Sequence, residues 1–501
     1  MPAHDVVSRL LTCALIGAAM QWHTPAFAHN TAPAHAVTAS LAARAVVLTS
    51  TRALVGTPGR VHRIAGAVHW RAGIVYELTG PVIVGDGGTL TIEAGARIEA
   101  RPGAFLNISR DGRIIADGTL LQPIVLTCTS VPQYEGCWGG MTIQGFAPLN
   151  FGAATSPEAR GTGAAGCPES GFSAEVQGSF GGCDPADSSG VVRYVRVEYA
   201  SKGLRLLGVG SGTLVDFVQV NRSAGDGVSV VGGNVDVQHL FLTANQGYGL
   251  SWRSGWRGRG QFVTVQQDQR GSLGGLLGSN EGSTPTSFAT EPRSAPTLLN
   301  VTIIAPPVVG VPVEDGPVAL RLHRGTSGTF RNVLLHTIGI ALDIDDSRTC
   351  VAGLSALTIT NAVIANSVQL GSADADPLAC EPYASPNVEA EWLGDPLNQV
   401  GVITDLAEAN ALIRLATNLI VPDLRPSSGG AAATNPAAVP PNDGFFDAQS
   451  TFIGAIAINA TGRNDIPWYS GWTVPAPIPP LGGGVLGTVS SPTLGLLSGI
   501  V

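Results

Sequence analysis

Lysine is almost absent from the chain: Lys202 is the only one among 28 basic residues. Charged residues of all kinds make up 13% of the 501 residues, and the formal net charge is −9. Because binding to duplex nucleic acid needs dense Lys and Arg to displace counterions, this composition argues against a nucleic-acid partner. The same scarcity leaves a Lys/Arg pair of the kind used by lyases with one possible centre, and the residues around Lys202 do not support one.

Long uninterrupted hydrophobic runs are also scarce. The clearest one, residues 10–20, follows Arg9 and is too short to span a bilayer. Residues 26–28, Ala-Phe-Ala, then supply the small-x-small pattern of a cleavage site. We therefore predict a signal peptide over residues 1–28 and an exported protein located in the periplasm, at the outer membrane or outside the cell. No later run is long enough to cross a bilayer without Pro or Gly, so no transmembrane segment is expected after the signal is removed.

The 7 cysteines include no C-x-x-C spacing, which argues against a zinc site or a thioredoxin-like site. Cys13 lies inside the predicted signal peptide, and the even number that remains favours disulfides in an oxidising compartment. Of the many possible pairings, the sequence favours three local ones: Cys128–Cys137, Cys167–Cys183 and Cys350–Cys380. No metal or other cofactor is expected, because the Gly-rich turns also lack the Lys-Ser/Thr of a phosphate-binding loop.

Glycine and proline are abundant, by contrast, with 65 Gly and 34 Pro, while 44% of the residues are hydrophobic. This balance is too apolar for a disordered chain and too rich in turn residues for a helical one. Between residues 82 and 126, short apolar pairs recur about every eight residues, separated by turns such as Gly85-Asp86-Gly87-Gly88. Apolar pairs that alternate in this way predict half-buried β-strands.

A longer repeat runs through the middle of the chain. One strand type returns at steps of 23, 22 and 23 residues, and its copies are Val195/Val197, Val218/Val220, Leu240/Leu242, Val263/Val265, Val301/Ile303, Val333/Leu335 and Val363/Ala365. A second strand type has the copies Leu204/Leu206, Val228/Val230, Leu250/Trp252, Leu320/Leu322 and Leu342/Ile344. A constant step stacks like residues on like residues, which a β-sandwich has no reason to do. We therefore predict an all-β fold, a right-handed parallel β-helix with about 22–25 residues per coil.

The repeat also sets the expected domain boundaries. These are a signal peptide (1–28), an N-terminal linker (29–59), the β-helix (60–400), a short helix with a Pro/Ala/Gly linker (401–442), a closing segment (443–473) and a flexible tail (474–501). Long loops, which often carry function, are expected to interrupt the β-helix at residues 152–190, 266–297 and 366–398. The short helix is predicted over residues 404–418, with Thr404 as its N-cap.

Several motifs resemble a known family. They are LTGPVIVGDGGTLTIEAGARIEA (78–100), GCWGGMTIQGFAPLN (136–150), SSGVVRYVRVEYA (188–200), DGFFDAQSTFIGAI (443–456) and WYSGWT (468–473). Together they resemble bacterial exported right-handed β-helix proteins, which are secreted or associated with the outer membrane and mostly lack an assigned activity. The resemblance covers nearly all of the mature chain, in order. It departs where such proteins carry an acidic stretch before VGGNV: here only Asp226 keeps an acid, which implies that any cation or ligand site formed by those acids is lost.

Two segments, 319–325 and 341–347, align residue by residue at a distance of 22 residues, or one coil. Their leucine and isoleucine pairs point inward, so Arg321 should stack on Asp343, and His323 on Asp345, about 4.8 Å apart on the outer surface. One interpretation is a site where His and carboxylates transfer protons on a bound sugar acid whose charge Arg neutralises. The other is a cross-strand ladder of ion pairs that stabilises the outer face, which is the commoner case.

The segment 247–260, GYGLSWRSGWRGRG, mixes Trp with Arg, a combination that suits stacking on sugars and pairing with anionic groups. Trp252 has the inward phase of its strand and is expected in the core. Trp256 and Tyr248 have turn positions and Arg253 has the outward phase, so these three are candidates for ligand binding. The alternative for each aromatic residue is ordinary packing.

We therefore expect a non-catalytic protein with a structural or carbohydrate-binding role, whose partner is a polysaccharide or a cell-envelope component. The candidate ligand-binding residues are Arg253, Trp256, Arg321, His323, Asp343 and Asp345, with the 266–297 loop walling a groove beside them. The alternative is a polysaccharide lyase or glycoside hydrolase that acts along the solenoid. No pair of Asp residues flanks a Gly-His turn, as in polygalacturonase-like hydrolases, and this favours the non-catalytic role.

Overall fold

The computed structural model of the protein describes residues 51–150, 171–173, 178–280, 287–308, 310–345, 349, 357–372, 388–413, 415–457 and 467–474. The chain divides into two compact units, residues 1–49 and 50–501, and the described residues all belong to the second. The predicted signal peptide and the tail beyond residue 474 lie outside the described residues.

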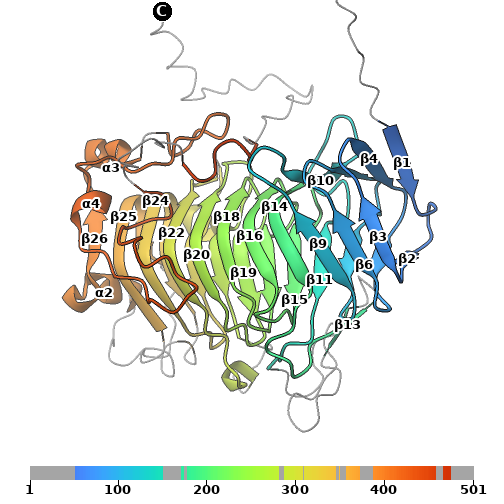
Figure 1. The fold of residues 1–501 in the computed structure, drawn as a ribbon. Helices are drawn as coiled ribbons and strands as arrows, with labels where there is room; N and C mark the ends of the chain where they lie inside the picture. Colours follow the sequence, from blue (N-terminus) through green and yellow to red (C-terminus); the bar gives the residue numbers. More distant parts are fainter. Residues whose placement is uncertain are drawn as a thin grey trace, which may run out of the picture. The chain divides into compact units, whose positions relative to one another are not determined.

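Three parallel sheets wind along the second unit (Figure 1). Sheet 1 contains β1 (Thr51–Val55), β4 (Ile74–Leu78), β7 (Arg97–Ala100) and β10 (Ile124–Cys128). Sheet 2 contains β2 (His62–Ile64), β5 (Val82–Val84), β8 (Leu106–Ile108), β11 (Met141–Gln144), β15 (Leu204–Leu207), β17 (Val228–Val231), β19 (Tyr248–Arg253), β21 (Gly274–Gly278) and β23 (Val318–Leu322). Sheet 3 begins with β3 (Ala67–Trp70), β6 (Thr89–Ile92) and β9 (Arg113–Asp117).

From β14 onward one continuous strand bends from sheet 3 into sheet 1. These strands are β14 (Gly190–Glu198), β16 (Leu214–Asn221), β18 (Val237–Thr243), β20 (Arg259–Gln266), β22 (Thr297–Ala305), β24 (Gly328–Ile344) and β25 (Leu357–Gly371). The ends of β24 and β25 also continue sheet 2. Sheet 1 ends at β26 (Val400–Ile403), while β12 (Gly171–Ser173) and β13 (Gly178–Phe180) form a separate antiparallel hairpin within the predicted 152–190 loop. The predicted parallel β-helix is confirmed, and its first strand already lies within the expected 29–59 linker.

The predicted step is confirmed over most of its length, since Val195 pairs with Val218, Val218 with Leu240 and Leu240 with Val263. The predicted position of the last copy of the first strand type, Val363/Ala365, is wrong by one residue. Val333 pairs with Ala362 rather than Val363, so Ala362 points inward and Val363 outward. Residues 362–365 are Ala-Val-Ile-Ala, apolar in both phases, and a period-2 pattern cannot choose between the two faces of such a strand.

Two of the segments predicted as loops contain strands of the β-helix. β21 lies inside the expected 266–297 loop and pairs with β19 on one side and β23 on the other. The expected 366–398 loop begins too early, because β25 runs on to Gly371. The apolar pattern does not predict β21, because its inward-facing position 278 is a glycine. The Trp252 ring fills the space of the missing side chain, since a Cβ at residue 278 would lie 2.3 Å from that ring.

The bend from sheet 3 into sheet 1 is made by one left-handed residue per coil. These corner residues are Tyr194, Phe217, His239, Phe262, Asn300, Asn332 and Asn361, with φ between 47° and 59°. Non-glycine residues adopt this conformation at a cost of about 1–2 kcal/mol each. Stacking offsets part of it, because the ring centroids are 4.4 Å apart for Tyr194 and Phe217, 4.0 Å for Phe217 and His239, and 4.8 Å for His239 and Phe262.

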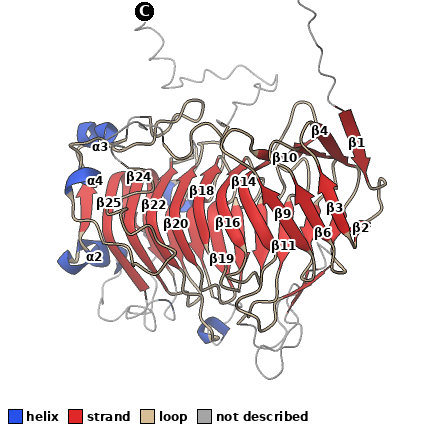
Figure 2. Cartoon of the chain, in the orientation of Figure 1, coloured by secondary structure: helices blue, strands red, loops and turns tan. Residues whose placement is uncertain are grey.

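After β26 the chain turns back along the solenoid. The α-helices α2 (Val388–Gly394), α3 (Leu406–Leu412) and α4 (Ala431–Thr434) lie at the end of the solenoid near β25 and β26 (Figure 2). The predicted 404–418 helix is α3, which is shorter and is capped by Asp405 rather than Thr404, through a 2.8 Å hydrogen bond from the Glu408 amide.

The returning chain meets successively earlier coils. The ring of His336 lies 2.8 Å from the Ala409 carbonyl, Asn332 donates to the Ala438 carbonyl, and Asn300 donates to the Phe452 carbonyl. Farther back, the Gln219 amide exchanges two 2.9 Å hydrogen bonds with the backbone of Val474. The returning chain, which includes the described residues of the predicted closing segment, therefore covers the corner residues.

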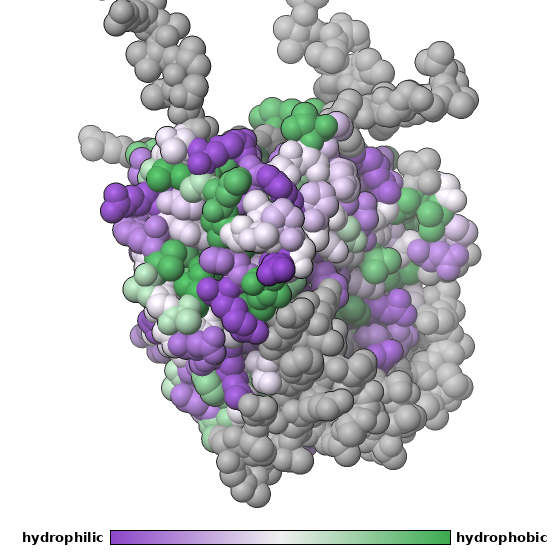
Figure 3. Space-filling model, turned by 90° about the vertical axis from the view of Figure 1, so that its right-hand side faces the viewer, coloured by the Kyte–Doolittle hydropathy of each residue, from purple (hydrophilic) through white to green (hydrophobic). Residues whose placement is uncertain are grey.

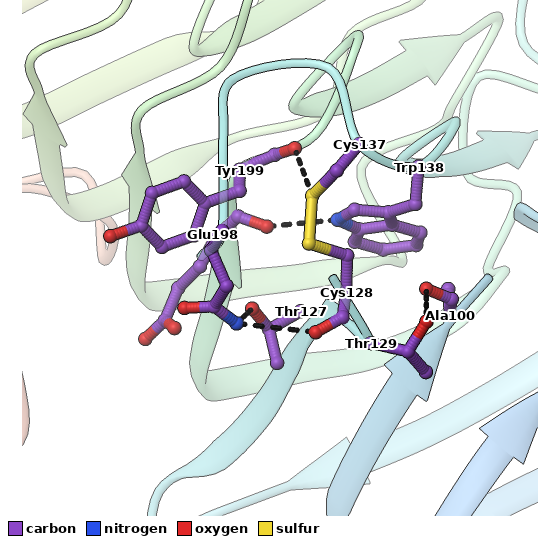
Figure 4. Close-up of a disulfide and its surroundings, with 9 residues drawn as sticks. Ala100, Thr127, Cys128, Thr129, Cys137, Trp138, Glu198 and Tyr199 are labelled. Carbon is purple, nitrogen blue, oxygen red and sulfur yellow. Dashed lines mark hydrogen bonds between the residues drawn. A yellow bond between two sulfur atoms is a disulfide. The ribbon is translucent and has the colours of Figure 1, made fainter. Parts of the chain in front are cut away.

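Of the predicted disulfides, Cys128–Cys137 is confirmed (Figure 4). It closes the loop after β10 against Trp138, whose ring Nε1 donates a 2.8 Å hydrogen bond to the Glu198 carbonyl. A loop of this length corresponds to about 2–3 kcal/mol in the chain-entropy model. Cys183 is also disulfide-bonded. Residues 167, 350 and 380 lie outside the described part, so the other two pairings stay predictions.

The end of the solenoid that begins with β1 carries apolar residues at its surface, including Leu54, which is 66% exposed. In Figure 3, which views the molecule from this side, hydrophobic and hydrophilic residues are interspersed. In the part of the chain that the structure describes, no helix is long and apolar enough to cross a membrane.

Candidate functional site

The structure brings Arg321 beside both predicted carboxylates on the outer face of sheet 2. Arg321 pairs in register with Asp343, and its Nε lies 3.2 Å from a carboxylate oxygen of Asp343. Its terminal nitrogen lies 2.9 Å from a carboxylate oxygen of Asp345. Tyr248, from β19, contacts the guanidinium through its hydroxyl. We call Arg321, Asp343, Asp345, Tyr248 and His323 the Arg321 cluster.

Burial differs sharply within the Arg321 cluster. The Asp343 side chain is 4% exposed, whereas that of Arg321 is 36% exposed. Burial opposes the positive charge of Arg321, yet the carboxylates of Asp343 and Asp345 outweigh it and raise the pKa of the guanidinium. Burial also raises the pKa of Tyr248, so its phenol stays protonated at neutral pH. The cluster therefore presents a fixed guanidinium whose charge is already balanced by its neighbours.

His323 directly follows β23, the strand that carries Arg321, and its imidazole is held neutral. Burial, followed by the positive charges of Arg324 and Arg321, lowers the pKa of His323 to about 4, although Asp345 acts in the opposite direction. The imidazole is therefore uncharged at neutral pH. An uncharged imidazole carries one donor and one acceptor nitrogen, so His323 can hydrogen-bond a hydroxyl-bearing ligand.

This lowered pKa predicts a pH dependence of stability. The unfolded chain binds a proton at the ordinary His pKa of about 6.5, whereas folded His323 does so only near 4. Between these two pH values the unfolded chain binds a proton that the folded chain does not. The contribution of neutral His323 to the free energy of unfolding is therefore complete above about pH 6.5 and is lost as the pH falls toward 4. We expect His323→Asn to flatten the curve of unfolding free energy against pH in this window by about 2–3 kcal/mol, measured by urea denaturation.

The control for this experiment is His62→Asn, at an exposed position. Burial lowers the pKa of His336 as well, and this contribution remains in both variants, so the difference from the parent curve isolates His323. If the curves of the parent and His323→Asn run parallel from pH 4 to 6.5, His323 is not held neutral by the fold.

A second polar group lies on the same face, closer to the N-terminal end. Asp226 accepts a 2.6 Å hydrogen bond from the Ser251 hydroxyl and a 2.9 Å hydrogen bond from the Tyr248 amide. The one acid kept at the position where the motif departs from its relatives thus bonds to its own chain. Leu277 of β21 lies in register between Ser251 and Arg321. Tyr248 joins the two polar groups, because its amide bonds to Asp226 while its hydroxyl contacts Arg321.

The remaining predicted site residues are placed differently. Arg253 is half-buried at the end of β19. It is not adjacent to His323, because β21 pairs between β19 and β23. Trp256 is fully buried, its Nε1 donates to the Val235 carbonyl at 3.0 Å, and its ring packs 5.9 Å from that of Trp252. The prediction that Trp256 offers its ring to a ligand is corrected: its turn lies over the interior of the solenoid, and the ring belongs to the core.

A cavity of about 460 Å³ lies elsewhere, between the corner residues and the returning chain. The closing segment was predicted from sequence, but nothing in its pattern indicated what it covers. We call it the closing-segment cavity; its lining residues are Gln238, His239, Phe262, Arg425, Phe445, Phe446, Asp447, Ser450, Phe452, Ala455, Ile456, Ala457, Pro467 and Trp468. The signal that could have drawn attention to it is the density of aromatic residues in DGFFDAQSTFIGAI and WYSGWT.

Among the described residues, no three His, Cys, Asp or Glu side chains gather in a way that could hold a metal ion. Comparison with known protein families shows that residues 62–386 match the family model described as a pectate-lyase-like beta helix domain. No curated protein and no solved structure matches the chain.

Proposed function

The chain belongs to the pectate-lyase-like β-helix family. We propose that it is an extracytoplasmic protein that binds carbohydrate without cleaving it. The observation that carries the proposal is the Arg321 cluster, in which a partly exposed guanidinium is fixed between two carboxylates beside an uncharged imidazole. The Cys128–Cys137 disulfide supports a location in an oxidising compartment.

The chemistry of the cluster suits hydroxyl groups. Planar guanidinium and carboxylate groups hold neighbouring hydroxyls by paired hydrogen bonds, and ordering them in advance reduces the entropy lost on binding. Two carboxylates face one guanidinium, so the cluster has no excess positive charge to offer a uronic acid. We therefore infer that a neutral glycan is the ligand.

The same contacts favour binding over catalysis. A hydrolase holds its two carboxyl groups on opposite sides of the scissile bond, whereas Asp343 and Asp345 both contact Arg321. A lyase needs a base near the working pH, but Tyr248 has a raised pKa and the pKa of His323 is about 4. The rival proposal, a polysaccharide lyase, has in its favour the description of the family.

A glycan array followed by calorimetry tests the proposal. The protein is expected to retain neutral glycans. Arg321→Lys and Asp345→Asn are each expected to weaken binding about tenfold or more, because Lys lacks the planar fork of donors and Asn has one acceptor oxygen in place of two. Arg257→Lys, at an exposed position on a turn, is the control and should bind like the parent.

Thermal unfolding of the same variants separates the two roles of the cluster. A pure ion-pair ladder predicts a lower Tm and unchanged glycan retention in both variants, and that result would reject the binding site. Incubation with uronic-acid polymers, followed at 235 nm and by reducing ends, tests the rival, since clear turnover would replace the proposed binding role with a catalytic one.

A further inference from the structure

We propose that the closing-segment cavity is a binding site for a small, uncharged aromatic ligand that carries a hydroxyl group, a phenol in the chemical sense. The site is independent of the Arg321 cluster, because its walls come from the corner residues and the returning chain rather than from sheet 2. Its volume of about 460 Å³ falls within the range of roughly 300–1,000 Å³ typical of small-molecule pockets.

The walls favour a flat aromatic ring. Phe262 of the corner and Phe452 of the closing segment face one another with their ring centroids 6.4 Å apart and their planes 23° apart. Trp468 meets the His239 ring edge-on, with centroids 5.2 Å apart. Rings in such parallel and edge-on arrangements attract further aromatic rings, each pair contributing about 0.5–1.5 kcal/mol beyond the buried area.

The polar atoms of the cavity favour a donor on the ligand. Asp216 holds Nδ1 of His239 at 2.7 Å. Because a carboxylate only accepts, Nδ1 carries a hydrogen, and in the singly protonated imidazole Nε2 is then the acceptor. The side-chain N–H of Gln238 donates to the Phe445 carbonyl at 2.8 Å, which leaves the side-chain oxygen of Gln238 as a second acceptor. Within the described part of the chain neither acceptor atom has a partner, so a hydroxyl donor on the ligand matches them.

The charges at the cavity favour an uncharged ligand. Arg425 pairs with Asp423 at 2.7 Å. The Asp447 carboxylate accepts from the Ser450 hydroxyl at 2.7 Å and from the Gln449 amide at 3.0 Å. Since Arg425 is already paired, an anionic ligand would give up hydration without gaining a dedicated counterion, and a cationic ligand would have to displace the Ser450 and Gln449 donors from Asp447.

Calorimetric titration of the whole protein with methyl 4-hydroxybenzoate tests the proposal. We expect saturable binding, weakened about tenfold or more for methyl 4-methoxybenzoate, whose ring is the same but whose hydroxyl donor is gone. Methyl β-glucopyranoside, which offers hydroxyls without an aromatic ring, should not compete. Absence of phenol binding, equal binding of the methyl ether, or preferred binding of the glucoside would each overturn the proposal.

Two variants locate the site. Ala457→Phe adds a ring at a residue that lines the cavity and whose methyl side chain makes no hydrogen bond, so it should abolish binding. Gln449→Phe adds the same ring at an exposed position outside the lining and should leave binding unchanged. Retained binding in Ala457→Phe would place the ligand elsewhere. The Arg321→Lys variant should bind the phenol like the parent, so failure of the glycan proposal does not affect this one.

Discussion

Replacing Gly140 with alanine is expected to destabilise the protein by more than about 4 kcal/mol, enough to prevent folding in a marginally stable chain. Gly140 has φ +96°, and a Cβ at this position would lie 1.7 Å from the backbone carbonyl oxygen of Lys202 in the next coil. The clash is with backbone, so no side-chain rotation relieves it. β11 and β15 would have to separate, and the register from Met141 to Gln144 would be lost with them.

Gly73→Ala is the matched control, because Gly73 also has a positive φ, +76°, but has no atom within 4 Å of a built Cβ. It carries only the conformational cost of about 1–2 kcal/mol. Urea denaturation followed by tryptophan fluorescence, with yield of soluble protein as a second readout, measures both variants. Equal losses in the two would show that the close approach of the coils at Gly140 does not limit stability.

The second large effect is expected at Asn300, the corner residue that holds the closing segment. Asn300 is fully buried with φ +54°, and its amide donates to the carbonyls of Phe452, at 2.7 Å, and Ser450, at 3.2 Å. Its amide oxygen accepts from Gln261 at 3.0 Å. Asn300→Val combines a β-branched residue at positive φ with the loss of three hydrogen bonds, and we expect a loss of about 3–5 kcal/mol.

Asn300→Gly separates the two causes, since glycine accepts the positive φ and loses only the hydrogen bonds. We expect it to lie between the parent and Asn300→Val in urea denaturation. Limited proteolysis should show faster cleavage within residues 443–457 in both variants, because the segment has lost its hydrogen bonds to Asn300. A closing segment that stays resistant in Asn300→Val would mean that other contacts alone hold it in place.

Much of the fold follows from local repetition. The step from Val195 to Val218 and onward needs no knowledge of distant contacts, because in a solenoid each strand pairs with its counterpart one coil away. The same arithmetic places Arg321 beside Asp343, and the short separation of Cys128 and Cys137 favours the disulfide between them. The repeat does not predict the pairing where the pattern is apolar in both phases, as at residues 362–365, or where glycine interrupts it, as in β21.

The sequence by itself thus determined the solenoid, its period and which side chains of neighbouring coils meet. The tertiary structure alone decided the burial of Trp256, the uncharged state of His323 and the cavity beneath the closing segment. The physical reason is the range of the contacts. Pairing between coils is periodic and appears in the order of the residues, whereas the bond from Gln219 to Val474 joins residues 255 positions apart, and no periodicity links them. Burial, and with it the pKa of a side chain, depends on such non-periodic neighbours.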